Sequence, residues 1–202
     1  MAFTFFFRDT QILELAVKKV VPAVMGRSKV KVWDAGCAMG PEPYSLAIML
    51  AEAMGHFAFR NLTIYATDID ETDTFGSIIK NGVYHEEELR RLPEGIVDKY
   101  FRPNGKPGYF QIAETIRERV MFQKHNLLSL QPVGNDFSLI LCKNVLLHFQ
   151  PQERAEVMKC FHGSLAPGGY LATEQTQKMP KEAEHLFEQV ASDGQIFRKV
   201  SN

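Results

Sequence analysis

Residues 29–40 read KVKVWDAGCAMG, an alternating apolar segment that runs directly into two glycines. The alternation over Lys29–Ala35 predicts a β-strand, and the glycines predict a tight turn into the helix that follows. Because glycine has no Cβ, such a turn lets the backbone approach a nucleotide-like ligand closely. Gly36 and Gly40 have G-x-x-x-G spacing, unlike the G-x-G-x-x-G of dinucleotide-binding proteins, and no Lys-Ser or Lys-Thr follows to form a phosphate-binding P-loop.

Strand-like and helix-like segments alternate along the rest of the chain, which is typical of an α/β domain. The segment 137–142 (FSLILC) is continuously apolar, as expected for a strand buried on both faces. We find no convincing linker and interpret residues 1–202 as one domain. The other expected elements are helices over 11–25 (with Pro22 as a candidate end), 42–54 and 151–165; strands over 62–67, 109–112, 120–123 and 170–173; a turn at 167–169; an amphipathic helical region over 70–102; and a hairpin within 189–200.

The composition of the chain excludes several classes of protein. The 202 residues carry a formal net charge of -1 and no clustered Lys/Arg footprint, which argues against a nucleic-acid partner. The longest apolar stretches fall short of the roughly 20 residues that a membrane span requires, so no membrane insertion is expected. Cys37, Cys142 and Cys160 lack the spacing of a metal site or disulfide framework, so we expect no metal and a cytoplasmic location.

Polar residues follow several of the predicted strands. Asp68 ends one strand, Asn126 follows the next, and Lys143 and Asn144 follow the apolar strand over 137–142. Ligands of open parallel sheets bind beyond the carboxyl ends of the strands, so these side chains are expected to meet in one crevice. An acid such as Asp68 can accept both ribose hydroxyls of an adenosine, while Asp70 is suited to cap the next helix.

Five segments carry a specific family resemblance. They are TFFFRD at 4–9, DAGCAMGPEPYSLA at 34–47, ATDID at 66–70, HNLL at 125–128 and LCKNVLLHF at 141–149. Their order and spacing resemble those of the catalytic domain of CheR-type chemotaxis receptor methyltransferases, over about residues 3–175. The resemblance implies a Rossmann-like class I methyltransferase, with a mostly parallel seven-stranded sheet, helices on both faces and a small inserted β segment.

The resemblance also implies a cofactor, a product and a substrate. The cofactor is S-adenosyl-L-methionine, the product is S-adenosyl-L-homocysteine, and the substrate is a glutamate carboxylate on a chemotaxis receptor-like protein. Family members usually carry an N-terminal helical recognition domain, and we expect residues 1–202 to form the catalytic domain without it. The connection at 104–108 is short where members that bind a receptor tail carry extra residues, so no tight docking on a receptor C-terminal peptide is expected.

Site residues follow from the same resemblance. Arg8 and His148 are implied to be catalytic. Asp68 is implied to hold the ribose, Asn126 and Leu127 to frame the adenine, and the glycine turn to face the methionine part. The full set implied to bind the cofactor is Thr4, Arg8, Gly36, Gly40, Glu42, Asp68, Asn126, Leu127, Lys143 and Asn144.

The implied reaction needs no strong base, because a glutamate with a reference pKa of about 4.3 is ionised at pH 7. The enzyme mainly aligns the carboxylate with the methyl group and removes water from it, and Arg8 is suited to that alignment. The chain departs from the family at Met39, Pro41, Lys143 and His148, where Thr, Glu, Arg and Tyr are usual. These departures leave open a cofactor-binding regulatory module without transfer activity. The expected absence of the recognition domain leaves open a methyltransferase for a small-molecule carboxylate.

Overall fold

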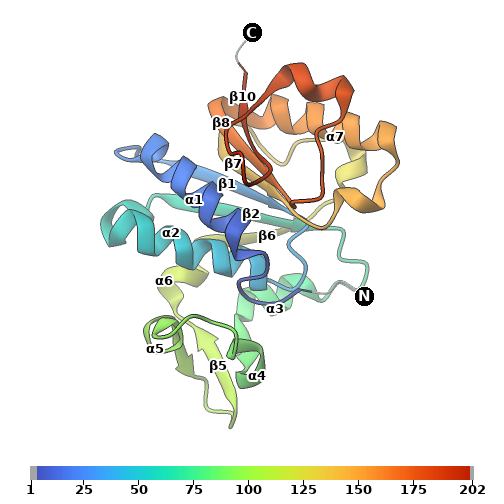
Figure 1. Ribbon diagram of the computed structural model, residues 1–202. Coiled ribbons are helices and arrows are strands. Elements are labelled where there is room, and N and C mark those ends of the chain that lie inside the picture. Colours follow the sequence, from blue (N-terminus) through green and yellow to red (C-terminus); the bar gives the residue numbers. More distant parts are fainter. Residues whose placement is uncertain (1–3, 201–202) are drawn as a thin grey trace.

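The computed structural model describes residues 4–200, and its centre is a seven-stranded sheet (Figure 1). The strand order is β6-β2-β1-β7-β8-β10-β9; all neighbours are parallel except β10, which is antiparallel to both β8 and β9. This arrangement confirms the expected fold class. The strands are β1 (Val30–Ala35), β2 (Leu62–Asp68), β6 (Val120–Lys124), β7 (Phe137–Cys142), β8 (Leu165–Thr173), β9 (Phe187–Gln189) and β10 (Ile196–Lys199).

Helices cover both faces of this sheet. Helices α1 (Thr10–Val24) and α2 (Pro41–Phe59) pack on one face, and α7 (Pro151–Ser164) lies on the other (Figure 1). Side chains of β1 alternate between the two faces, as the pleat requires. Val32 belongs to the core under α1 and α2, whereas Trp33 packs with Phe161 of α7 at a centroid distance of 5.2 Å.

Two helix ends differ in part from the expectation. Helix α1 continues through Pro22 to Val24, so Pro22 does not end it. Proline has no backbone N–H, so α1 lacks the hydrogen bond that residue 22 would otherwise donate to the carbonyl of residue 18. Helix α2 is interrupted at Gly55, where φ is 73° and ψ is 160°, which confirms the predicted stop; a further helical turn then reaches Phe59.

The expectation of one helical region over 70–102 is wrong. Gly82, with a φ of 59°, ends α3. Pro93 and Gly95 lie in a second non-helical stretch before α5. Three short strands form a separate antiparallel sheet of order β3-β5-β4, the small inserted β segment that was expected. The elements here are α3 (Phe75–Asn81), β3 (Val83–His85), α4 (Glu86–Leu89), α5 (Ile96–Tyr100), β4 (Phe101–Pro103), β5 (Tyr109–Ile112) and α6 (Glu114–Arg117).

The C-terminal third contains one further correction. Residues 167–169 do not form a turn before a strand but lie inside β8, whose pairing with β7 shifts register between Phe137 and Leu139. The expected hairpin near the end is present as β9 and β10. The 3-10 helices are η1 (Leu127–Ser129), η2 (Leu146–His148) and the longer η3 (Lys181–Leu186).

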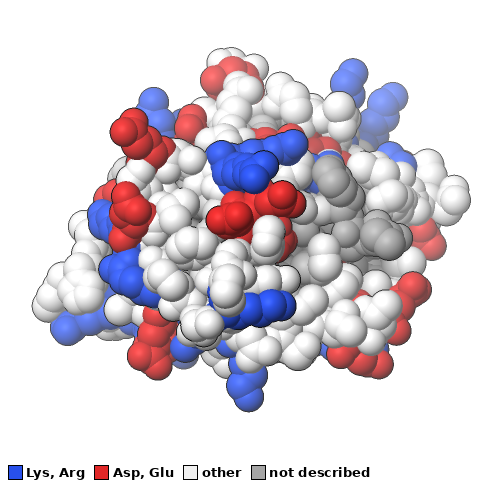
Figure 2. Space-filling model, turned by 90° about the horizontal axis from the view of Figure 1, so that it is seen from below, with Lys and Arg blue, Asp and Glu red and all other residues white. Residues whose placement is uncertain are grey.

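The charged side chains on the face in Figure 2 are as evenly mixed as the net charge of -1 suggests. Figure 2, seen from below, shows acidic and basic side chains interspersed over that face, with one acidic and one basic group adjacent near its centre. Within residues 4–200, no helix is long and apolar enough to cross a membrane.

Candidate cofactor and substrate site

Two adjoining cavities of about 510 Å³ and 230 Å³ lie beyond the carboxyl ends of β1, β2, β6 and β7. Four residues line both cavities and so join them: Gly36, Asp68, Val145 and His148. The rest of the larger cavity is lined by Thr4, Arg8, Ala38, Glu42, Lys143, Asn144 and Leu147. The rest of the smaller one is lined by Thr67, Ile69, His125, Asn126, Leu127 and Phe149. Every residue implied to bind the cofactor except Gly40 therefore lines this crevice.

The glycine turn forms one wall of the crevice. The Gly36 amide donates to the Thr67 carbonyl at 2.7 Å, which joins the ends of β1 and β2, and Gly36 has a φ of 103°. Gly40 is directed elsewhere, because a Cβ added to it would lie 2.6 Å from the Tyr84 hydroxyl. Gly40 instead begins α2 with a φ of 104°, so its role in the structure is to shape the turn.

Asp68 stands between the two cavities and braces the glycine turn. One of its carboxylate oxygens accepts the Ala38 amide at 3.0 Å, and the other accepts the Asp70 amide at 3.1 Å. A carboxylate has about four acceptor positions, so the side chain retains positions for a ligand. Asp70 accepts the amides of Thr74 and Phe75, each at 3.1 Å, at the start of α3. Asp70 therefore caps α3, as expected.

The smaller cavity has the character of a site for a flat ring. Leu127 is 8% exposed and packs into the core beneath the cavity, while Ile69 and Phe149 contribute apolar surface. Asn126 accepts the Leu128 amide at 2.9 Å through its side-chain oxygen, which starts η1 and holds the side chain in place. A largely apolar pocket with a few fixed polar groups suits an adenine.

The segment before α1 is anchored over the larger cavity. Phe6 is fully buried and its ring centroid lies 4.8 Å from that of Tyr84. The Phe7 amide donates to the Ser45 hydroxyl at 2.8 Å. These contacts confirm that the aromatic run fixes the segment and places Thr4 and Arg8 along the cavity.

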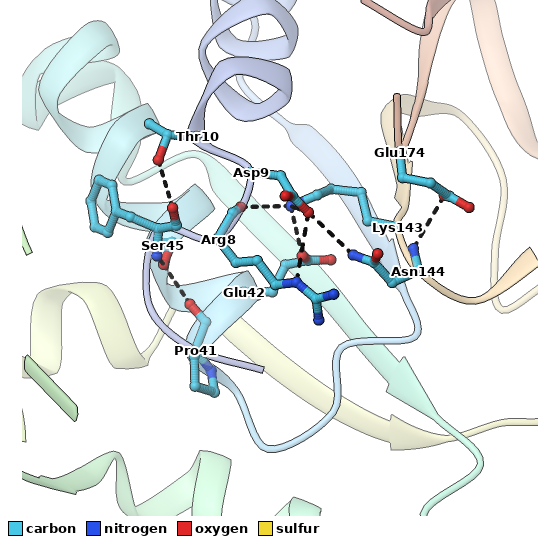
Figure 3. Close-up of polar contacts among 10 residues, drawn as sticks. Arg8, Asp9, Thr10, Pro41, Glu42, Ser45, Lys143, Asn144 and Glu174 are labelled. Carbon is cyan, nitrogen blue, oxygen red and sulfur yellow. Dashed lines mark hydrogen bonds and ion pairs between the residues drawn. The ribbon is translucent and has the colours of Figure 1, made fainter. Parts of the chain in front are cut away.

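A buried ion pair joins three distant parts of the chain at the larger cavity (Figure 3). The Lys143 side chain is 0% exposed, and its ammonium donates to the Arg8 carbonyl at 2.8 Å and to Glu42 at 3.0 Å. Asp9, at 3.7 Å from the same ammonium, accepts the Asn144 side-chain amide at 3.3 Å. Lys143 thus acts on the cavity by holding Glu42 and the backbone of Arg8.

Three acids of this region were not among the predicted site residues. Asp9 and Glu174 both hold Asn144, since Glu174 accepts the Asn144 amide at 3.1 Å and Asn144 has a φ of 59°. Asp34, at the end of β1, lies fully buried beside Glu42. Glu174 and Asp34 lie at the ends of strands, as the predicted site residues do. That position in the sequence could have identified both acids as candidates for the site.

Burial governs the titration of this region. Desolvation by burial raises the pKa of Glu42, although Lys143 opposes the shift. Burial, with the neighbouring Glu42, raises the pKa of Asp34 well above its usual value. Burial also raises the pKa of the Cys37 and Cys142 thiols, so neither is suited to act as a thiolate nucleophile.

Comparisons with known proteins identify the family. The family model described as "CheR methyltransferase, SAM binding domain" matches residues 2–196. Chemotaxis protein methyltransferase 1 of Pseudomonas aeruginosa is 29% identical over 204 residues, which cover 96% of this chain and 73% of the relative. Chemotaxis protein methyltransferase Cher2 of Pseudomonas putida is 30% identical over 204 residues, covering 96% of this chain and 72% of the relative.

Solved structures agree on the fold. A magnesium protoporphyrin IX methyltransferase from Synechocystis, with bound SAM, has a TM-score of 0.51 at 17% identity, covering 95% of this chain and 79% of that one. A TehB-like SAM-dependent methyltransferase from Corynebacterium glutamicum has a TM-score of 0.50 at 14% identity, covering 91% and 85%. The chain therefore belongs to the CheR family of S-adenosylmethionine-dependent methyltransferases.

Proposed function

We propose that this protein transfers a methyl group from S-adenosylmethionine to a glutamate side chain of a chemotaxis receptor-like protein. The observation that carries the proposal is the larger cavity, in which Arg8 and His148 both line the space beyond the glycine turn and Asp68. Such a cavity offers a guanidinium for a carboxylate next to the expected position of the cofactor. The names of the relatives, chemotaxis protein methyltransferases, support the choice of substrate.

The crevice offers a distinct place for each part of the cofactor. The apolar smaller cavity suits the adenine, and Asp68 between the cavities suits the ribose hydroxyls. The methionine part would then lie in the larger cavity among Thr4, Glu42 and Asn144. When bound there, the cofactor supplies an electrophilic methyl group on a sulfonium.

The protein residues have mainly to position the substrate. One oxygen of the glutamate carboxylate forms a bond to the methyl carbon as the bond from sulfur to that carbon breaks, which yields a methyl ester and a neutral thioether. Arg8 orients the carboxylate, and the surrounding side chains remove water from it. The anchored Phe6 keeps the Arg8 backbone in place during this step. His148 lines the same cavity and can contact the ester oxygen.

One observation favours a second function, a regulatory module that binds the cofactor without transfer. The chain has Lys143 where the family usually has Arg, and its ammonium is engaged by Glu42 and the Arg8 carbonyl. It also has the exposed His148 where the family usually has Tyr. Lys143 lines the larger cavity and His148 lines both cavities, and neither departure alters Asp68 or the glycine turn, so they affect transfer more directly than binding.

We further propose that the activity is cytoplasmic. The part of the chain that the structure describes holds three free cysteines, of which Cys37 and Cys142 are buried, and this suits a reducing compartment.

Calorimetry and a transfer assay test the proposal together. Titration with S-adenosylmethionine and S-adenosylhomocysteine should show binding of both. Labelled methyl should then pass to a receptor cytoplasmic fragment with glutamates at its modification sites and not to the same fragment with glutamines. Binding of the cofactor without transfer to any receptor or small carboxylate would favour the regulatory module, and absence of binding would contradict both functions.

A further inference from the structure

Three buried carboxyl oxygens, one on Glu42 at the larger cavity and two on the neighbouring Asp34, have no hydrogen-bond donor among the residues that the structure describes. They are both side-chain oxygens of Asp34 and the Oε1 atom of Glu42. Asp34 is 0% exposed and Glu42 is 7% exposed, so bulk water does not supply the missing donors. The two carboxyl groups lie within hydrogen-bonding reach of each other.

A single proton resolves this arrangement. Two ionised carboxylates have no proton to donate to each other, so side by side in a buried setting they would only repel each other. When two carboxyl groups share a buried site, burial and the charge on one group both raise the pKa of the other, which favours a proton on one of them. With one proton between them, one group donates and the other accepts, and the hydrogen bond is complete.

The neighbouring charges place that proton on Asp34. Glu42 Oε2 accepts from the Lys143 ammonium at 3.0 Å, and this contact stabilises the ionised form of Glu42. Asp34 has no cation in contact among the described residues; the titratable groups that face it are Glu42 from α2, Lys143 from the end of β7, and Asp68 from the end of β2. The thiols of Cys37 and Cys142 also face it, and Asp9 faces Glu42 from the segment before α1.

We propose that Asp34 is a protonated positioning residue that donates a hydrogen bond to Glu42 Oε1. Glu42 is then held between Asp34 on one side and Lys143 on the other, and the buried trio of Asp34, Glu42 and Lys143 is electrically neutral. This arrangement fixes the face of Glu42 that lines the larger cavity. The effect on cofactor binding rests on the proposed function, whereas the protonation of Asp34 does not.

Infrared spectroscopy of the ligand-free protein tests the protonation directly. A protonated carboxylic acid has a carbonyl stretching band that a carboxylate lacks. The parent protein at pH 7 should show this band, and Asp34→Asn should remove it. Asp193→Asn, in the exposed hairpin, is the control and should leave the band unchanged. If Asp34→Asn removes no such band, Asp34 is ionised and the proposal is overturned.

Binding measurements test the positioning role. Asparagine keeps a side-chain donor for Glu42 and leucine does not, although both are uncharged and similar in size to aspartate. We expect Asp34→Leu to weaken the binding of S-adenosylmethionine about 10-fold, and Asp34→Asn to stay close to the parent, because only leucine loses a hydrogen bond to a charged group. Equal losses in the two variants would overturn the role of the donor.

A failure of the proposed function can be distinguished from a failure of the proposal about Asp34. If the parent protein binds no cofactor, the proposed function fails, yet the infrared band still decides whether Asp34 carries a proton. If Asp34→Leu does not fold, Asp34→Asn remains decisive: a folded variant with parent-like affinity supports the neutral donor, and loss of affinity overturns it.

Discussion

Gly36 and Val145 lie so close together that a single added carbon would not fit between them. A Cβ on Gly36 would be 2.1 Å from Val145 Cγ2, far inside van der Waals contact. The contact joins the glycine turn after β1 to the loop after β7, and both residues line both cavities. The width of the crevice therefore depends on a glycine at this position.

Gly36→Ala should lower the free energy of unfolding by about 3 kcal/mol or more, because it adds overpacking to the cost of a φ of 103°. Chemical denaturation measures the effect. Gly26→Ala is a matched control, since Gly26 has a φ of 81° and nothing within 4 Å of its added Cβ. The control should cost only about 1–2 kcal/mol from backbone strain. Equal losses in the two variants would contradict the importance of the Val145 contact.

Asp68→Ala should weaken the binding of S-adenosylmethionine by about 1.5–3 kcal/mol, the value of hydrogen bonds to a charged group. Part of this loss comes from the Ala38 amide, which Asp68 holds at 3.0 Å. Asp70→Ala is the comparison, because it removes the cap of α3 and should cost about 1 kcal/mol of stability with little change in affinity. Calorimetry and denaturation separate the two effects. Unchanged affinity in Asp68→Ala would show that the ribose does not bind there.

Arg8→Ala should slow methyl transfer roughly 10- to 1,000-fold, a reasonable span for the loss of one positioning contact. Cofactor affinity should fall much less, because Asp68 and the glycine turn remain. The variant keeps the Arg8 carbonyl that accepts from Lys143, so the segment should stay in place. Arg90→Ala, on the exposed end of α4, is the control for loss of a positive charge and should change neither quantity. Loss of cofactor binding in Arg8→Ala, with no transfer by the parent, would favour the regulatory module.

The contribution of Asp34 to the free energy of unfolding should fall as the pH rises from about 4, the ordinary pKa of an aspartate in the unfolded chain. Above that pH the unfolded chain releases the Asp34 proton, while the folded protein, in which burial raises the pKa of Asp34, retains it. This difference of one bound proton lowers the free energy of unfolding by about 1.4 kcal/mol per pH unit, until the pH reaches the pKa of Asp34 in the folded protein. Denaturation of the parent and of Asp34→Asn across this range should show the smaller slope in the variant. Parallel curves would mean that Asp34 does not titrate differently in the two states.

A peptide from the C-terminus of a chemotaxis receptor should not bind with micromolar affinity. The connection between β4 and β5 is a closed turn in which the Asn104 amide donates to the Tyr109 carbonyl at 3.2 Å. The Lys106 ammonium lies 3.8 Å from the centre of the Tyr109 ring and covers it. Titration calorimetry with such a peptide checks this, and a dissociation constant in the micromolar range would refute it.

Local patterns in the sequence determined the strands and the glycine turn of this protein. The alternation over 30–35 has the side-chain period of a strand, and the short apolar run over 137–142 suits a strand that is buried on both faces. The crevice follows from topology, since residues at the carboxyl ends of neighbouring parallel strands must meet. Asp68, Asn126 and Asn144 were therefore predictable as neighbours of one crevice from their positions after strands.

Only the tertiary structure decided which charges meet and where each group points. Lys143 and Glu42 are 101 residues apart, and their contact depends on β7 lying next to β1. Gly40 points toward Tyr84 because the small sheet packs there, and no local pattern encodes that direction. Asp34 likewise has the pattern of a polar strand end, but its state depends on being buried beside a second carboxyl group. The periodicity of the sequence indicates whether a residue lies in a helix or a strand. Which charged groups pair depends on contacts between distant segments, and only the folded chain creates these.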